Sequence, residues 1–242
     1  VTVVGQDLFA SSFLQHIADL TGDTEGVRVL PAHTTAAYNA LLTAAGDITM
    51  SVSSMRVFDS FGEDLVAAHS DAVRDALAVV LDANLPVRSM AAVCALCVAH
   101  GTPLFIEPTS ADKCHKVVQA GCLPAVAVLS PGVRELAAMA ASFLPEGTLQ
   151  DENAQLQAMH SQGVKAVMLH KGPEGVILST LSSRVAIPAT PLTDSILSPS
   201  GAGDSLLGCT VAEAVRGCGR GDVCVHDTAR LEAAVRVGVR CA

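Results

Sequence analysis

The sequence of 242 residues has no tryptophan and one tyrosine, so aromatic side chains make up only 3% of it although half of its residues are hydrophobic. Small aliphatic side chains suit the close packing of helices against a sheet, which favours the α/β class. No apolar run reaches the length of a membrane span, so we expect no membrane insertion. A net charge of −9 without any basic stripe argues against a nucleic-acid polymer as partner.

The chain also lacks an initiating methionine and a signal peptide, and it opens on an apolar, strand-like stretch, Val-Thr-Val-Val-Gly. We expect the natural N-terminus to lie before Val1, and residues 1–242 to form a single, N-terminally incomplete domain in the cytoplasm.

The eight cysteines lie mostly in apolar segments, which favours reduced core thiols. Cys94 and Cys97 have metal-type spacing, but no second pair completes a site, so buried structural thiols are the favoured interpretation.

Strand-like and helix-like segments alternate along most of the chain. Short apolar runs between turn residues predict buried strands, and apolar residues three or four positions apart predict helices. This alternation predicts a doubly wound α/β fold, in which a mostly parallel sheet is sandwiched by helices. The predicted strands are 1–4, 27–30, 78–82, 103–106, 125–129, 164–169, and an antiparallel pair, 175–180 and 184–187. The predicted helices are 7–20, 63–77, 86–100, 111–120, 132–143, 152–162, a helix after Gly201, and 229–241. In the first helix, the side chains predicted to face inward are Phe9, Phe13, Ile17 and Leu20.

One pair of strands is predicted to stand apart from the main sheet. The segments 34–42 and 48–53, joined around residues 45–47, have the pattern of a hairpin with mixed faces. We interpret residues 34–53 as a small β lid that closes over a ligand and excludes water. Because an exposed sheet edge can pair with a second copy, a homodimer through this lid is a candidate assembly.

A glycine-rich turn leads into a helix near the C-terminus, where residues 200–204 read Ser-Gly-Ala-Gly-Asp. Glycines let the backbone approach a ligand closely, and the free N–H groups at a helix start bind anions. Asp204 would repel a bound phosphate unless it accepts a proton from a nearby hydroxyl, a pairing that phosphoryl transfer to an alcohol requires. The alternative is an N-cap aspartate without chemistry. The segment matches neither a Walker A loop nor a dinucleotide fingerprint.

Several other polar side chains follow predicted strands, namely Asp82, Glu107, Ser130 and His170. Ligands of doubly wound folds bind at the carboxyl ends of strands, so we expect these side chains to share one crevice with Asp204. An anionic substrate such as ATP would need help there from a helix N-terminus, Lys171 or a metal ion, since the chain is acidic overall.

Residues 200–205, Ser-Gly-Ala-Gly-Asp-Ser, resemble the signature of the ribokinase (PfkB-type) carbohydrate kinases. Three more segments resemble that family in its own order: 81–85 (Leu-Asp-Ala-Asn-Leu), 130–136 (Ser-Pro-Gly-Val-Arg-Glu-Leu) and 169–176 (Leu-His-Lys-Gly-Pro-Glu-Gly-Val). The resemblance covers nearly the whole chain, without the family's opening strand and Gly-Gly-Asn segment. Within the family, the chain is most similar to pseudouridine kinases, through its Glu-Pro-Thr segment at 107–109 and Thr-Ala-Ala-Tyr at 35–38.

This resemblance implies a kinase that uses ATP and Mg²⁺, with a monovalent cation such as K⁺ as a further candidate, to phosphorylate the 5′-hydroxyl of a sugar or nucleoside. Pseudouridine is the first choice of substrate, and ribose, adenosine or another substrate of the family is the alternative. A nucleotide-binding protein without catalysis is the alternative from a different class. By resemblance, Asp204 is the catalytic base, and Gly201, Ala202 and Gly203 supply the anion hole. The residues implied to line the nucleotide site are His170, Lys171, Gly172 and Gly175.

The sequence departs from the family's pattern at three of these positions. The family usually has threonine where His170 stands, an uncharged residue where Lys171 stands, and asparagine where Gly132 stands. Lys171 has the alternative of an ordinary lysine in a surface turn. Loss of the asparagine at Gly132 removes one contact to nucleotide or metal, unless water supplies it.

Three further residues keep two interpretations each. Glu135 resembles the family's metal-organising glutamate, which acts on Mg²⁺ through water, and its alternative is a solvent-facing helix residue. Glu107 is either a contact of the metal or substrate or a strand-end carboxylate that caps the helix that follows. Tyr38 is either a substrate contact that covers a ribose or base or a half-buried aromatic of the hairpin.

Overall fold

The computed structural model describes residues 1–43, 48–191, 200–219, 223, 225 and 227–242. The strands of its central sheet are β5 (Val79–Asp82), β6 (Leu104–Glu107), β7 (Val126–Leu129), β8 (Ala166–His170), β9 (Val176–Thr180) and β10 (Arg184–Ile187). Their spatial order is β10-β9-β8-β7-β6-β5. The neighbours from β5 to β8 are parallel, and β9 and β10 add an antiparallel edge. The predicted mostly parallel sheet is therefore confirmed.

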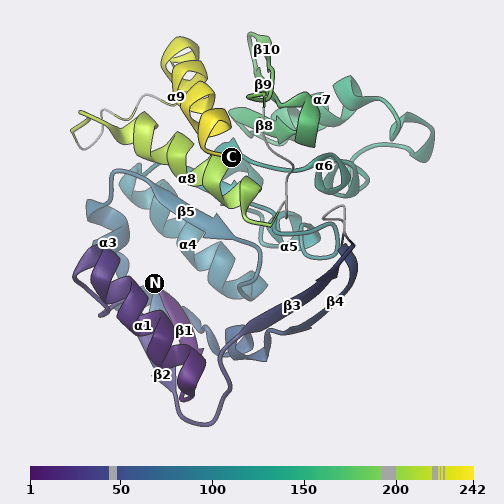
Figure 1. The fold of residues 1–242 in the computed structure, drawn as a ribbon. Coiled ribbons are helices and arrows are strands. Elements are labelled where there is room, and N and C mark those ends of the chain that lie inside the picture. Colours follow the sequence, from purple (N-terminus) through teal and green to yellow (C-terminus); the bar gives the residue numbers. More distant parts are fainter. Residues whose placement is uncertain (44–47, 192–199, 220–222, 224, 226) are drawn as a thin grey trace.

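Helices cover both faces of this sheet (Figure 1). Successive side chains of a strand point to opposite faces, so Leu104 and Ile106 enter one apolar core while Phe105 enters the other. All three are fully buried, as expected of a strand covered on both sides. The helices on the first face are α2 (Glu63–Ala68), α4 (Val87–His100), α5 (His115–Gln119), α6 (Val133–Ala140) and α7 (Glu152–Ser161), and those on the second are α8 (Ala202–Val215) and α9 (Thr228–Cys241).

Two predicted helices are shorter than expected. The predicted helix 63–77 is interrupted at His69, between α2 and α3 (Ser70–Asp75). The imidazole Nδ1 of His69 lies 2.9 Å from the Leu65 carbonyl oxygen, which would accept the backbone N–H of residue 69 in a continuous helix. The predicted helix 111–120 is reduced to α5, because residues 110–114 form a turn.

Short 3₁₀ turns complete the helical structure, and they are η1 (Arg56–Ser60), η2 (Leu123–Ala125), η3 (Glu146–Thr148) and η4 (Gly172–Glu174). Within the part of the chain that the structure describes, no helix combines the length and the apolar character that crossing a membrane requires.

The N-terminal part of the chain forms a separate two-stranded parallel sheet from β1 (Thr2–Gly5) and β2 (Val27–Leu30). Helix α1 (Leu8–Thr21) connects them, and Asp7 caps it by accepting a hydrogen bond from the Ala10 N–H at 2.9 Å. The helix lies at the margin of the molecule (Figure 1).

The prediction that the apolar side of α1 faces the core is wrong. The exposed fractions of Phe9, Phe13 and Leu20 are 68%, 37% and 69%, and Ile17 is half-buried. Within this helix Ala10 alone is buried. Helical spacing identifies side chains that share a face, but it does not reveal whether another element covers that face.

The predicted hairpin is present as β3 (Ala37–Leu42) and β4 (Ile48–Ser54), an antiparallel pair with a register shift near its tip. It extends from the body of the molecule (Figure 1). Its turn, residues 45–47, lies outside the described residues. Its function as a lid stays a prediction.

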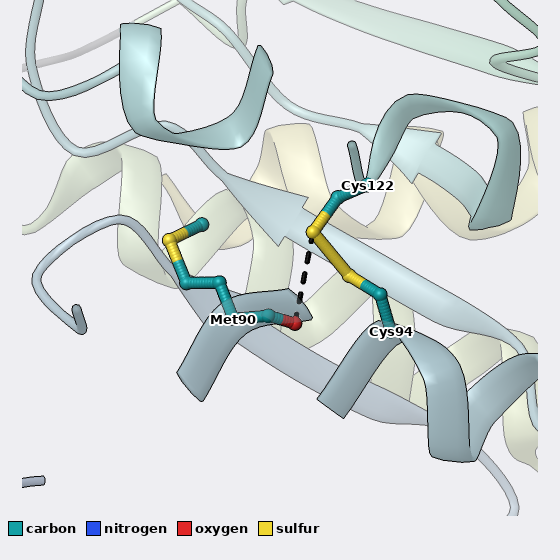
Figure 2. The surroundings of a disulfide bond; sticks show 3 residues. All are labelled: Met90, Cys94 and Cys122. Carbon is teal, nitrogen blue, oxygen red and sulfur yellow. Dashed lines mark hydrogen bonds between the residues drawn. A yellow bond between two sulfur atoms is a disulfide. The ribbon is translucent and has the colours of Figure 1, made fainter. Parts of the chain in front are cut away.

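The expectation that all cysteines are reduced is wrong for one pair. Cys94 of α4 and Cys122, just before η2, form a disulfide with their Cα atoms 5.7 Å apart, and the Cys122 Sγ lies 3.7 Å from the Met90 carbonyl oxygen (Figure 2). The two cysteines are 28 positions apart and their spacing gave no signal, because only the packing of α4 against η2 brings the two sulfurs together. Cys97 and Cys114 are buried free thiols, as predicted.

Candidate active site

The carboxyl ends of the parallel strands meet at one edge of the central sheet. Asp82 and Glu107 are direct partners in the register between β5 and β6. His170, at the end of β8, forms a bridge with Gly132, which follows β7. Ser130 follows β7 directly and is fully buried. The strand-end residues identified in the sequence therefore lie along a common edge.

The carboxyl group of Glu107 interacts with three other carboxylates. Burial, then the charge of Glu135, and then the charges of Asp204 and Asp82 raise the pKa of Glu107 from 4.5 to about 7. A hydrogen bond from the backbone N–H of Thr109 at 2.5 Å opposes this rise. Acidic side chains from separate segments of the chain therefore lie within electrostatic reach of one another, Asp204 among them.

Glu107 also supports the turn that follows its strand. Thr109 has a positive φ of 72°, which is rare for a β-branched residue. Besides its N–H bond to Glu107, its hydroxyl accepts a hydrogen bond from the Ala83 N–H at 3.0 Å. Glu107 therefore caps the turn at Thr109 instead of the helix that follows, which was the predicted target, because α5 begins only at His115. Its contact with a ligand stays a prediction. The sequence analysis used Thr109 only within the Glu-Pro-Thr segment and did not predict its left-handed backbone, which its neighbours impose.

Glu135 lies in the first turn of α6, which begins after Gly132. Its Oε2 accepts a hydrogen bond from the Gly132 N–H at 2.6 Å, so the carboxylate folds back over the start of its own helix. The side chain is half-buried, which contradicts the alternative of a solvent-facing residue. Its carboxylate lies beside the strand ends, since one of its oxygens is within 4.8 Å of ligand atoms of Glu107 and His170.

His170 joins these two glutamates in one cluster. Glu107, Glu135 and His170 each offer one ligand atom, and these atoms lie within 4.8 Å of one another. The ring Nε2 lies 3.1 Å from the Ser130 carbonyl oxygen. The Ser130 hydroxyl is buried and has no hydrogen-bond partner among the described residues. Two carboxylates and an imidazole are a donor set that fits a divalent cation.

The start of α8 adjoins this cluster. Gly201 precedes the helix with a φ of 86°, a left-handed conformation that favours glycine. A Cβ on Gly203 would lie 3.8 Å from the His170 Cε1, so the first turn of α8 lies beside the end of β8. Asp204 is exposed in that turn, where the backbone N–H groups have no partner within the helix. Residues 192–199, which lead into this turn, lie outside the described residues.

Lys171 is held in ion pairs at a surface turn. Its Nζ lies 3.1 Å from Glu152 and 3.4 Å from Glu174, and the bond to Glu152 is the main reason that the pKa of Lys171 is raised. The backbone N–H of Lys171 donates a hydrogen bond to the Gly175 carbonyl oxygen at 2.8 Å, which closes the turn that contains Gly172. These contacts favour the surface-turn interpretation of Lys171. A contact between this turn and a nucleotide stays a prediction.

Tyr38 lies on β3 opposite Ser53 and is 51% exposed, so the hairpin leaves about half of its surface available. Its contact with a substrate stays a prediction. The shared crevice of Glu107 and His170 was predicted from the sequence, whereas the presence of Glu135 beside them was not. The available signal was that His170 and Glu107 each end an apolar strand, but their proximity also depends on the strand order.

Comparisons with known proteins agree with the fold. The chain is 25% identical over 208 residues to the pseudouridine kinase of Escherichia coli (strain K12), covering 86% of this chain. It spans only 64% of the length of that relative. Ribokinase from Giardia lamblia superposes with a TM-score of 0.80 at 17% identity, over 98% of this chain and 73% of that one. Arabidopsis thaliana ribokinase complexed with ribose and ATP superposes with a TM-score of 0.76 at 20% identity, over 100% of this chain and 74% of that one.

These structural similarities show a shared fold, and the family assignment rests on a separate observation. The profile described as "pfkB family carbohydrate kinase" matches residues 1–242, the whole chain. The glycine-rich turn before α8 and the strand-end carboxylates are the features that the resemblance had identified. The chain therefore belongs to the pfkB family of carbohydrate kinases.

Proposed function

We propose that this protein transfers the γ-phosphoryl group of ATP to the 5′-hydroxyl of a sugar or nucleoside, and that pseudouridine is its substrate. The observation that carries the proposal is the position of Asp204, in the first turn of α8 directly after the left-handed Gly201. Such a turn offers N–H donors for a phosphate and a carboxylate for the attacking hydroxyl.

In this proposal Asp204 accepts the proton of the substrate hydroxyl as its oxygen attacks the γ-phosphorus. The bond between the γ-phosphorus and the bridging oxygen of ATP breaks, and ADP leaves. The N–H groups of Gly201, Ala202 and Gly203 stabilise the charge on the transferred group. The turn around Gly172 and Gly175 would bind the nucleotide through its backbone, since Lys171 is already paired with Glu152 and Glu174.

A cation is required by the electrostatics of the site. The triphosphate of ATP is negatively charged, and it would approach a cluster of four acidic side chains, Asp82, Glu107, Glu135 and Asp204. Mg²⁺ bound to the phosphates would screen this repulsion, and Glu135 would hold it through water, because Mg²⁺ retains much of its hydration. When bound, the metal would neutralise charge that develops on the phosphoryl oxygens. K⁺ is a further candidate cofactor.

The choice of pseudouridine is supported by the match to the Escherichia coli pseudouridine kinase and by the Glu-Pro-Thr segment at 107–109. Ribose or adenosine is the alternative substrate.

We also propose a homodimer through the hairpin, because Leu41, Met50 and Val52 expose 59%, 55% and 64% of their surface there. Sedimentation of the full-length protein tests that assembly.

The proposed activity is tested with full-length protein, ATP and Mg²⁺, by comparing phosphorylation of pseudouridine, uridine, ribose and adenosine. We expect the highest kcat/KM for pseudouridine. Turnover of another substrate would retain the kinase and refute the substrate, whereas ATP binding without any turnover would favour a non-catalytic nucleotide-binding protein.

Asp204→Asn tests the base directly. Loss of a general base lowers rates by roughly 10²–10⁴-fold, so we expect kcat to fall by that factor while ATP still binds. Asp19→Asn is the matched control, because Asp19 is exposed on α1 and contacts Gln15. Equal kcat values for Asp204→Asn and the wild type would refute the assignment of the base.

A further inference from the structure

The cluster of Glu107, Glu135 and His170 differs from an all-oxygen magnesium site by its nitrogen donor. The three side chains come from the end of β6, the first turn of α6 and the end of β8, and all are half-buried. Their ligand atoms lie within 4.8 Å of one another. One cation placed among them could therefore contact all three.

Hydrogen bonding fixes which nitrogen of His170 is available. The Ser130 carbonyl oxygen, 3.1 Å from Nε2, can only accept a hydrogen bond, so Nε2 carries the proton in this arrangement. In the neutral ring, Nδ1 then keeps its lone pair. A histidine that donates one ring N–H to a backbone carbonyl is oriented as metal-binding histidines usually are.

The absence of a side chain at Gly132 leaves room beside this nitrogen. A Cβ at Gly132 would lie 3.6 Å from the His170 Nδ1 and 3.4 Å from the Glu135 Oε2, so both ligand atoms border the same space. Two of the three departures from the family's pattern, at Gly132 and His170, are therefore neighbours in space.

We propose that Glu107, Glu135 and the Nδ1 of His170 bind a first-row transition-metal ion directly, in preference to Mg²⁺. Imidazole nitrogen favours transition metals, whereas Mg²⁺ selects oxygen ligands and gives up its water reluctantly. A cation also relieves the repulsion between the two glutamates. The inference deepens the proposed function by placing a directly bound transition metal at this site instead of Mg²⁺ held by Glu135 through water, and it rests on that function only for the metal's part in catalysis.

Metal binding is measured on full-length protein treated with a chelator and then freed of it, without nucleotide. Mn²⁺ is titrated by electron paramagnetic resonance of the free ion, and Mg²⁺ by its competition with Mn²⁺. We expect Mn²⁺ to bind at least ~10-fold more tightly than Mg²⁺. We expect His170→Thr, which restores the family's usual residue, to weaken Mn²⁺ binding by more than the roughly 10-fold that loss of a mere outer-shell partner costs, because a direct ligand is removed. Its effect on Mg²⁺ binding should remain within about twofold, because Mg²⁺ gains little from a nitrogen ligand.

His100→Thr is the matched control, because His100 is exposed at the end of α4. It precedes the start of β6 and so lies at the amino ends of the strands, at the opposite end of the sheet from His170. Equal affinities for the two ions, or an unchanged Mn²⁺ affinity in His170→Thr, would overturn the proposal. If that variant fails to fold, pulsed electron paramagnetic resonance of Mn²⁺ bound to the wild type decides. Coupling to a ligand ¹⁴N supports the site, and its absence refutes it. Because these measurements need no substrate, failure of the metal site is distinguishable from failure of the kinase.

Discussion

Replacing Glu107 by glutamine measures what the crowding of carboxylates costs the folded chain. Burial and the neighbouring charges raise the pKa of Glu107 from 4.5 to about 7, so the folded state holds this proton more tightly than the unfolded state. The stability that protonation contributes is complete below the unfolded pKa of 4.5, and it is lost as the pH rises through 7. One pKa unit corresponds to about 1.4 kcal/mol, so the loss approaches an upper limit of about 3–4 kcal/mol as the pH rises above 7.

Glutamine stays neutral at every pH, and its amide oxygen can still accept the hydrogen bond from the Thr109 N–H. We therefore expect Glu107→Gln to unfold at a higher urea concentration than the wild type at pH 8, with a smaller difference at pH 5. The assay is urea unfolding across this range with a chelator present, so that bound metal does not offset the repulsion.

Glu146→Gln serves as the control, because Glu146 is an exposed residue of η3. Its pH profile should follow that of the wild type. Parallel stability profiles for Glu107→Gln and the wild type would show that this carboxylate is not destabilised in the folded chain, and the account of the charge cluster would then be wrong.

Two further predictions concern stability. Opening the Cys94–Cys122 disulfide should lower the free energy of unfolding by roughly 3–4 kcal/mol, since the bond closes a loop across a separation of 28 residues. The test compares the urea midpoints of the oxidised protein and the Cys94→Ala/Cys122→Ala variant, with Cys97→Ala as a control that keeps the bond. Equal midpoints for the oxidised protein and the double variant would contradict the prediction. Gly175→Ala should cost at least roughly 1–3 kcal/mol, because its φ is 95° and the new Cβ would lie 2.2 Å from a carbonyl oxygen of β10. Gly147→Ala, whose Cβ would meet nothing within 4 Å, should change the melting temperature little, and similar losses in both glycine variants would count against the steric argument.

Much of the fold could be predicted because its information is local. Apolar runs located β5 to β10 within a residue or two, and helical spacing located α4, α6, α7 and α9. The helix start after Gly201 was also predictable, since glycine followed by an acidic first turn is a local pattern. The break at His69 was not, because it arises from a competing side-chain bond rather than from a helix-breaking residue.

The candidate site was predictable only in part, for the same physical reason. The sequence by itself determined that Asp204 opens a helix after a glycine turn and that Glu107 and His170 end apolar strands. Tertiary structure alone decided that Glu135 joins these two residues, that Lys171 is paired with Glu152, and that the apolar side of α1 stays exposed. A hydrophobic pattern specifies the conformation of a segment and which side chains share its face. Which segments then become neighbours depends on the order of strands in the sheet and on the packing of helices over it, and no local pattern carries that information.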